Sequence, residues 1–382
     1  PWLALTDYSK AKMKIGLIGA GRLGICLALL MEDAGYEVVV SDCRDNYVLG
    51  LNNRIIKTNE PQVVEMLDDA KNFVAVLDNV EVIQQCDIIY TLVPTPSLPD
   101  GSYDVSAVWQ VVKDFQNCEF PIDGKTFVVG CTTNPGDCEL FQKQLNKHGV
   151  DVYYNPEFIA QGSIIKDLQY ADMVLIGGEG KHLDVIKEIY TKIQLSEPKV
   201  HTMSTTAAEL VKLAVNCFLT TKITYANMVG EVMALSGREC EISKVLKAIG
   251  DDTRVGSKYL NFGYGYGGPC LPRDNRSFAA YAKKLGLEYN LGLTTDNFND
   301  EHARFLVDWF VNRNIEKLPF AFNYISYKEG TDIVEESQQY RLCYDLLNLG
   351  YKVYVVDDLV KSQCDDRIVW GIPVEEVFWI NL

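Results

Sequence analysis

Histidine is scarce in this sequence, and a net positive charge and long apolar runs are missing from it. Only four histidines occur among 382 residues, and none stands at the spacing of metal ligands, so no metal site is expected. No run of about twenty apolar residues exists, so no membrane span is expected. The net charge of −16 argues against nucleic acid or an anionic membrane as a partner. It does not exclude a phosphorylated small ligand, which helix N-termini and a few cations can hold.

The cysteines lack any Cys-x-x-Cys pair and are odd in number. Eleven of them are scattered through apolar segments, which indicates a reducing cytosol and not a disulfide scaffold. A cytoplasmic location is therefore predicted. The first twelve residues contain no basic segment followed by an apolar core, so no signal peptide is expected, and Met13 is the expected natural start of the fold. The content of 47% hydrophobic and 23% charged residues is typical of a soluble globular protein, and the length suggests two or three domains.

A dinucleotide-binding fingerprint stands near the start of the chain. An apolar run over Lys14–Gly19 predicts a buried strand, and the motif Gly19-x-Gly21-x-x-Gly24 follows it. Its glycines would give a tight turn and a close approach to a pyrophosphate, and a helical pattern over 22–34 would aim a helix N-terminus at the phosphate charge. A second predicted strand ends in Asp42, which would bind the adenosine ribose and favour NAD over NADP. Arg44 lies close enough to leave NADP open.

Strands and helices alternate over residues 13–203, which is the signature of a doubly wound parallel sheet. Polar motifs follow three predicted strands: Pro94-Thr95-Pro96, Thr132-Thr133-Asn134-Pro135 and Asn155-Pro156-Glu157-Phe158. Ligands of such sheets bind outside the carboxyl ends of the strands, so these turns should face the same crevice as the glycine fingerprint. The predicted strands are 14–19, 37–42, 73–77, 87–93, 126–130, 150–154, 172–177 and 199–203.

The rest of the chain divides into a helical region and a second, smaller α/β region. Residues 204–314 show helical patterns with a glycine-rich interruption at 256–268, and 318–382 return to strand, helix and strand at 319–325, 335–349 and 351–357. A long helix from about Thr205 to Leu235 is too apolar to be solvated on all sides, and we expect it to form a homodimer interface. The apolar residues behind this expectation are Leu210, Leu213, Ala214, Cys217, Phe218 and Leu219.

A cysteine behind a glycine-rich turn is the most informative feature of the helical region. Gly263–Gly268 precedes Cys270, and Asp274 follows four residues later, which would place the thiol and the carboxylate on one helix face. A thiol beside a carboxylate and a closely packed ligand suggests covalent catalysis. A buried structural cysteine is the alternative for Cys270 alone. Lys212 and Asn216 likewise share a helix face, and here the alternative is a surface lysine whose stem covers apolar neighbours.

With these segments assembled, the chain resembles the UDP-glucose/GDP-mannose dehydrogenase family. The resemblance covers about 13–357 and rests on six motifs in family order, with a weaker echo in YKEGTDIVEES of the C-terminal region. It implies a three-domain enzyme with a long central helix at the dimer interface, which oxidises the C6 alcohol of a nucleotide sugar to a carboxylate with two NAD⁺ in succession. The implied domains are an NAD-binding domain at 13–203, a central helical domain at 204–314 and an abbreviated nucleotide-sugar-binding domain at 315–382. The six motifs are GAGRLG, VPTPSLPDGSYD, CTTNP, NPEF, ELVKLAVN and GYGGPCLPRD.

The resemblance also implies roles for single residues. Cys270 resembles the nucleophile that traps an aldehyde as a thiohemiacetal and then becomes a thioester. Lys212 and Asn216 resemble the groups that stabilise an oxyanion, and Asp274 the carboxylate that orders Lys212 and the catalytic water. Glu157 resembles the general base of hydrolysis, and Thr133 the residue that positions water. The implied cofactor-binding residues are Gly19, Gly21, Arg22, Leu23, Gly24, Asp42, Pro94, Thr95, Thr133 and Arg273. The implied substrate-binding residues are Phe158, Ile159, Gln161, Lys212, Asn216, Arg254, Tyr259, Gly267 and Lys328, with Arg254 contributed by a neighbouring subunit.

Structural alternatives exist for three of these residues: Glu157 could cap a helix, Thr133 could close a turn, and Asp274 could be the N-terminal acid of a helix. The sequence also departs from the family pattern. Gln161 replaces a second carboxylate, Arg273 stands where lysine is commoner, Glu335 reverses the charge of an arginine expected near the nucleotide, and the chain after Asp357 is short.

Two other functions therefore stay open. One is a two-electron β-hydroxyacid dehydrogenase of the 6-phosphogluconate type, which would not need Cys270 or Glu157, and the other is a non-catalytic NAD- or sugar-nucleotide-binding protein.

Overall fold

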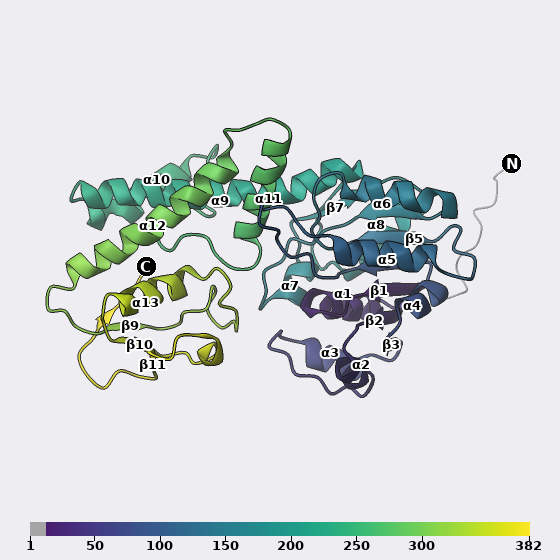
Figure 1. The fold of residues 1–382 in the computed structure, drawn as a ribbon, viewed down its shortest axis with the longest axis horizontal. Helices are drawn as coiled ribbons and strands as arrows, with labels where there is room; N and C mark the ends of the chain where they lie inside the picture. The colour runs from purple at the N-terminus through teal and green to yellow at the C-terminus, as the bar shows by residue number, and fades with distance from the viewer. Residues whose placement is uncertain (1–12) are drawn as a thin grey trace. The chain divides into compact units, whose positions relative to one another are not determined.

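The computed structural model describes residues 13–382 and divides them into two compact units (Figure 1). The first unit comprises the described residues up to Leu98 together with Tyr103–Lys212, and the second comprises Pro99–Ser102 and Leu213–Leu382. The expected absence of a signal peptide concerns residues 1–12, which lie outside the described residues. The predicted division into three domains stays a prediction.

The first unit is built on an eight-stranded sheet with the order β3-β2-β1-β4-β5-β6-β7-β8. All eight predicted strands are present. Seven of them are short, mainly apolar runs, whereas β8 (Lys199–Met203) is mixed in polarity and largely exposed. The first six strands follow the order of a doubly wound sheet and pair in parallel. The strands are β1 Lys14–Ile18, β2 Glu37–Ser41, β3 Phe73–Val76, β4 Ile88–Thr91, β5 Thr126–Val129, β6 Asp151–Tyr154, β7 Met173–Gly177 and β8 Lys199–Met203.

One junction departs from the predicted parallel sheet. β6 and β7 pair antiparallel through Tyr154 and Gly177, whereas β7 and β8 are parallel to each other. The apolar run over β7 indicates a buried strand in either direction, so its direction could not be read from the sequence. The sheet is therefore parallel except at this junction, and the predicted doubly wound α/β class is confirmed.

Alternate residues of the strands enter two separate hydrophobic clusters. Val38 and Val40 of β2 belong to one cluster together with the buried side of α1 (Arg22–Asp33), while Val39 belongs to the other. Because successive side chains of a strand point to opposite faces, the sheet is covered by apolar contacts on both sides. The other helices of this unit are α2 Asp45–Asn52, α3 Val63–Asp69, α4 Asn79–Gln85, α5 Ser106–Gln116, α6 Asp137–Leu145, α7 Ile164–Gln169 and α8 Leu183–Ile193.

The long helix α9 spans Thr205–Leu235, its predicted bounds. The second unit continues with α10 (Ile242–Asp251), α11 (Leu271–Lys284) and α12 (Leu291–Arg313). Between residues 13 and 382, no helix is both long and apolar enough to cross a membrane.

A four-stranded parallel sheet, in the order β11-β10-β9-β12, completes the second unit. It shares one hydrophobic cluster with α12 and α13, in agreement with the predicted second α/β region. The elements are β9 Phe320–Phe322, α13 Gln338–Asn348, β10 Val353–Val355, β11 Val369–Trp370 and β12 Phe378–Trp379.

Candidate functional site

The glycine turn after β1 has the shape that a dinucleotide phosphate requires. Gly19 has a φ of +97°, and a Cβ there would lie 2.6 Å from the carbonyl oxygen of Leu92; a Cβ at Gly24 would lie 2.0 Å from the carbonyl oxygen of Gly19. Gly21, by contrast, has no neighbouring atom within 4 Å of such a Cβ and directly precedes the first residue of α1. The turn is therefore tight where it packs and open at the helix N-terminus, which fits the pyrophosphate of NAD.

Asp42 follows β2, as the fingerprint requires, and is almost fully buried. Its two carboxylate oxygens accept hydrogen bonds from the guanidinium of Arg44, at 2.7 and 2.8 Å. The Arg44 guanidinium also stacks 4.0 Å from the ring centre of Tyr47. Burial alone would raise the pKa of Asp42, but the hydrogen bonds and charge of Arg44 outweigh burial and hold that pKa below its ordinary value. Asp42 is thus a carboxylate acceptor suited to ribose hydroxyls, with a cation directly beside it.

Turns after neighbouring strands are joined by side-chain hydrogen bonds in the first unit. Asn134, after β5, accepts a hydrogen bond from the amide of Tyr103 at 2.8 Å and donates one to the carbonyl of Tyr103 at 2.9 Å. Tyr103 lies beyond the turn that contains Pro94, which is exposed, and Thr95, which is buried. Two of the three turns expected to face one crevice are therefore held together.

Thr133 is fully buried and does not face open space. Its hydroxyl donates to Oε1 of Glu209 at 2.8 Å, and the same carboxylate accepts the amides of Gly136 at 2.7 Å and Cys138 at 2.9 Å. Burial raises the pKa of Glu209 to about 7, although these hydrogen bonds lower it. Glu209 thus closes the turn at the N-terminus of α6, and Thr133 retains only acceptor lone pairs for any water.

Glu157 is desolvated but contacts two groups that both favour its ionised form. The buried phenol of Tyr190 on α8 donates a hydrogen bond to Oε1 of Glu157. Lys212 is buried, donates to the backbone carbonyl of Glu157 at 2.8 Å, and lies 4.7 Å from the ring centre of Phe158. Desolvation raises the pKa of Glu157 to about 7, although the hydrogen bond from Tyr190 and the charge of Lys212 lower it. A carboxylate that titrates near neutral pH is suited to act as a general base.

In the second unit, Cys270 is exposed and stands directly before α11. The amide of Asp274 donates to the carbonyl of Cys270 at 2.9 Å, so the predicted spacing of one helical turn is present. Asp274 is buried, and its carboxylate accepts a hydrogen bond from the amide of Asn216. The N-terminus of a 14-residue helix favours negative charge on the sulfur. Of the eleven cysteines, all within the described residues, Cys43, Cys240 and Cys270 are exposed and none forms a disulfide.

The other predicted site residues are distributed over both units. In the first unit, Ile159 and Gln161 are half-buried, and Arg22 is exposed at the start of α1 beside half-buried Leu23. In the second unit, Arg254 is exposed and pairs with Asp252 at 2.7 Å, and Tyr259 has a φ of +62°. The half-buried residues Arg273, Gly267 and Lys328 complete the set.

Three charged or polar side chains of these surroundings were not singled out from the sequence: Glu209, Tyr190 and Arg276. Glu209 lies within the motif ELVKLAVN, and a glutamate on an apolar helix could have indicated a buried acceptor. Tyr190 and Arg276 carry no such signal, because their partners lie 33, 20 and 60 residues away in the chain. Among residues 13–382, no group of three or more His, Cys, Asp and Glu side chains is arranged to hold a metal ion.

Comparisons with known proteins identify the family of the chain. Residues 13–194 match the model for the NAD binding domain of the UDP-glucose/GDP-mannose dehydrogenase family, and residues 206–301 match the model for the central domain of that family. YtcA of Bacillus subtilis is 30% identical over 355 residues, which cover 90% of this chain and 81% of YtcA. The UDP-glucose 6-dehydrogenase AglM of Haloferax volcanii is 27% identical over 370 residues, which cover 93% of this chain and 85% of AglM.

A solved structure is also similar over almost the whole chain. The UDP-glucose dehydrogenase of the archaeon Pyrobaculum islandicum superposes with a TM-score of 0.84 at 26% identity, covering 97% of this chain and 88% of that one. The family models together match well over half of the residues. The chain therefore belongs to the UDP-glucose/GDP-mannose dehydrogenase family and is an NAD-dependent dehydrogenase.

Proposed function

We propose that this enzyme oxidises the C6 hydroxyl of a nucleotide sugar to a carboxylate through a covalent intermediate on Cys270. The observation that carries the proposal is the exposed thiol at the N-terminus of α11, followed one turn later by a buried carboxylate that binds Asn216. A simple two-electron alcohol dehydrogenase has no need of such a nucleophile. NAD⁺, when bound at the glycine turn, accepts a hydride from C6 in each of the two oxidation steps.

The chemistry on the protein side starts after the alcohol has become an aldehyde. The Cys270 thiolate adds to C6, and the carbonyl oxygen becomes the oxyanion of a thiohemiacetal. Loss of the C6 hydride converts this adduct to a thioester. Water then attacks the thioester, the C6–S bond breaks, and the carboxylate leaves with the thiol restored. Holding the aldehyde on sulfur keeps a reactive intermediate from escaping between the two oxidations.

Lys212 and Asn216 stabilise the oxygen that becomes negative in both additions. They lie four residues apart on α9, which places them on one face of the helix. One preorganised donor of this kind contributes on the order of 3 kcal/mol to lowering a barrier. Glu157 takes the proton from the attacking water, a task suited to a carboxylate with a pKa of about 7. Gln161, a neutral amide, binds substrate or water and takes no proton.

The enzyme is further proposed to act as a homodimer that uses one face of α9. Of the predicted interface residues, Leu213 and Cys217 are buried within the chain, whereas Phe218 is 64% exposed. An apolar stripe continues along the helix at helical spacing, with exposed Tyr225, Met228, Val232 and Leu235. Phe218→Asp should therefore shift the mass measured by light scattering to that of a monomer, and an unchanged mass would remove this interface. Arg254 would then be the residue contributed to the neighbouring subunit's substrate.

A panel of nucleotide sugars tests the proposed substrate class. UDP-glucose is the first candidate, because AglM and the Pyrobaculum islandicum protein carry that activity in their names. UDP-N-acetylmannosamine and GDP-mannose complete the panel, with glucose 1-phosphate and 6-phosphogluconate as controls. NADH formation together with a uronate product, identified by mass spectrometry, supports the proposal. Turnover of 6-phosphogluconate alone would replace it with the two-electron alternative.

A further inference from the structure

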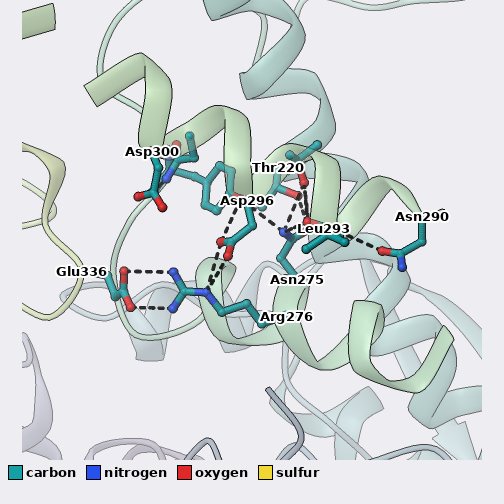
Figure 2. A network of polar contacts seen from close by, with 12 residues as sticks. Thr220, Asn275, Arg276, Asn290, Leu293, Asp296, Asp300 and Glu336 are labelled. Carbon is teal, nitrogen blue, oxygen red and sulfur yellow. Dashed lines mark hydrogen bonds and ion pairs between the residues drawn. The ribbon is translucent and has the colours of Figure 1, made fainter. Parts of the chain in front are cut away.

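Arg276 joins two carboxylates that belong to distant segments of the second unit. Its Nε donates to both oxygens of Asp296 on α12, at 3.1 and 2.9 Å. Its two terminal nitrogens donate to the two oxygens of Glu336, at 2.7 and 3.4 Å (Figure 2). All three side chains are partly shielded from water, with exposures between 22% and 38%. A planar guanidinium shared in this way fixes the orientation of both acids.

Glu336 belongs to the segment Tyr327–Ser337, which packs directly on the glycines before the thiol. A Cβ at Gly267 would lie 2.3 Å from the carbonyl oxygen of Glu336, and a Cβ at Gly268 would lie 2.3 Å from the ring of Tyr327. Gly268 has a φ of +82°, and Glu336 itself has a φ of +52°. Both ends of the segment thus touch the turn that sets the position of Cys270. No side chain fits between them.

The opposite side of the glycine turn is held by α12. The backbone of Tyr266 exchanges hydrogen bonds of 3.0 Å with the side-chain amide of Asn299. Asn275, fully buried on α11, donates to the Tyr266 hydroxyl at 3.2 Å and to Thr295 at 3.1 Å. These hydrogen bonds hold α11, the turn and α12 together. Asp296 of α12 points towards Arg276 (Figure 2).

Arg276 is consequently a polar link from α11 both to α12 and to the segment Tyr327–Ser337. Its backbone carbonyl also packs on the loop tip Pro99–Ser102, where a Cβ at Gly101 would lie 3.1 Å away. Without the guanidinium, Asp296 and Glu336 would keep two partly buried negative charges with no cation between them. A displacement of the segment therefore strains the ion pair of Arg276 as well as the close contacts at Gly267 and Gly268.

We propose that Arg276 is a positioning residue that couples the binding of a nucleoside diphosphate at the segment Tyr327–Ser337 to the placement of the Cys270 thiol. This inference rests on the proposed function and on the role in substrate binding that the family resemblance implies for Lys328 of that segment. The binding energy of the nucleotide, a part of the substrate that does not react, is then used at the reacting carbon. Arg276 touches neither substrate nor cofactor in this account, and it acts through Glu336 and the glycine turn.

Alkylation of Cys270 measures the coupling without turnover. The enzyme is treated with iodoacetamide, with and without UDP and with GDP in parallel, and the peptide that contains Cys270 is followed by mass spectrometry. In the native enzyme the nucleotide should change the alkylation rate of Cys270 by about fivefold or more, a usual size for coupled sites. In Arg276→Gln this dependence should vanish while the Kd for the same nucleotide stays within about threefold, and Arg276→Lys, which keeps the charge, should restore part of it.

A second test variant, a matched control variant and a kinetic measurement separate the inference from simpler explanations. Glu336→Gln breaks the same pair from the other side and should also uncouple the thiol. Arg304→Gln removes an exposed ion pair with Glu301 on α12 and should behave as native. In steady state, Arg276→Gln should lower kcat far more than it raises KM, because the nucleotide still binds.

Two results overturn the inference. A variant Arg276→Gln that keeps the full nucleotide dependence of Cys270 alkylation contradicts the coupling, and so does one whose nucleotide binding is itself lost. The proposed function fails separately, on the products formed from the substrate panel. An enzyme that makes the uronate, with a Cys270 thiol indifferent to UDP and GDP, would retain the function and reject the coupling.

Discussion

The phenol of Tyr190 donates a hydrogen bond to the carboxylate of Glu157, so a residue of α8 supports the loop that follows β6. The same carboxylate has a pKa of about 7, which is raised by desolvation and lowered by Tyr190 and Lys212. Tyr190 thus stabilises the ionised form of the proposed base. It does so from within the first unit, where the sheet and α8 hold both groups.

Tyr190→Phe should shift the pH dependence of acid formation towards higher pH. The hydroxyl favours the carboxylate form of Glu157, so its loss raises the pKa of that group and leaves less ionised base at neutral pH. A pH–rate profile of carboxylate release, native against Tyr190→Phe, measures the shift. Tyr170→Phe, at an exposed tyrosine beyond α7, is the matched control. A midpoint that stays in place or moves to lower pH would show that Tyr190 does not tune Glu157.

Glu157→Gln should stop the reaction at the thioester. An amide takes no proton from water, so the covalent adduct on Cys270 should accumulate and be visible by intact-protein mass spectrometry. Gln161→Ala should mainly weaken substrate binding, and Gln161→Glu should change the rate modestly. If Glu157→Gln hydrolyses its thioester normally while the Gln161 variants stall at the adduct, the proposed roles of the two residues are exchanged.

Asp42→Ala should weaken NAD binding and improve the use of NADP relative to NAD. The variant loses the ribose acceptor and also releases the Arg44 guanidinium, which is then free to pair with a 2′-phosphate. The double variant Asp42→Ala, Arg44→Ala should bind NAD as weakly as Asp42→Ala does, but it should not share the improved affinity of Asp42→Ala for NADP. Kd values for both cofactors, measured by fluorescence titration, decide the matter. Equal affinity of the native enzyme for NAD and NADP would refute the role given to Asp42.

Glu209 should make the protein less stable as the pH rises towards neutrality. Its pKa is raised from 4.5 to about 7 by burial, so between these values the folded chain binds more protons than the unfolded chain. The free energy of unfolding therefore falls through this window, by on the order of 3 kcal/mol at most, and is constant above about pH 7. Thermal midpoints between pH 5 and pH 8 should fall less in Glu209→Gln than in the native protein. Glu65→Gln, at an exposed glutamate of α3, should keep the native slope, and an equally steep Glu209→Gln profile would contradict the assignment.

The sequence predicted the strands and the long helix well because these depend on local patterns. Seven of the eight strands are short, mainly apolar runs, and α9 is a long apolar helix with its predicted bounds. The antiparallel junction at Tyr154 and Gly177 depends on chain direction, which an apolar run does not encode. The glycine fingerprint could be located because φ > 0 and close approach demand glycine itself.

The contacts around the proposed site residues could not be predicted in the same way. Thr133 donates a hydrogen bond to Glu209, which lies 76 residues further along the chain, and Arg276 pairs with Glu336, which lies 60 residues further along. Such pairs follow from tertiary packing and leave no periodic trace in the sequence. The family motifs indicated which residues are candidates, whereas their hydrogen-bond partners became visible only in the folded chain.

The ratio of NADH formed to nucleotide sugar consumed tests the central claim most directly. With limiting sugar nucleotide and excess NAD⁺, the covalent route through Cys270 predicts two NADH and one uronate per sugar. Cys270→Ser should form no uronate, because an alcohol is a poorer nucleophile than a thiolate near neutral pH and its ester is harder to hydrolyse. A native ratio of one NADH per sugar, with an aldehyde or ketone as the product, would contradict the account.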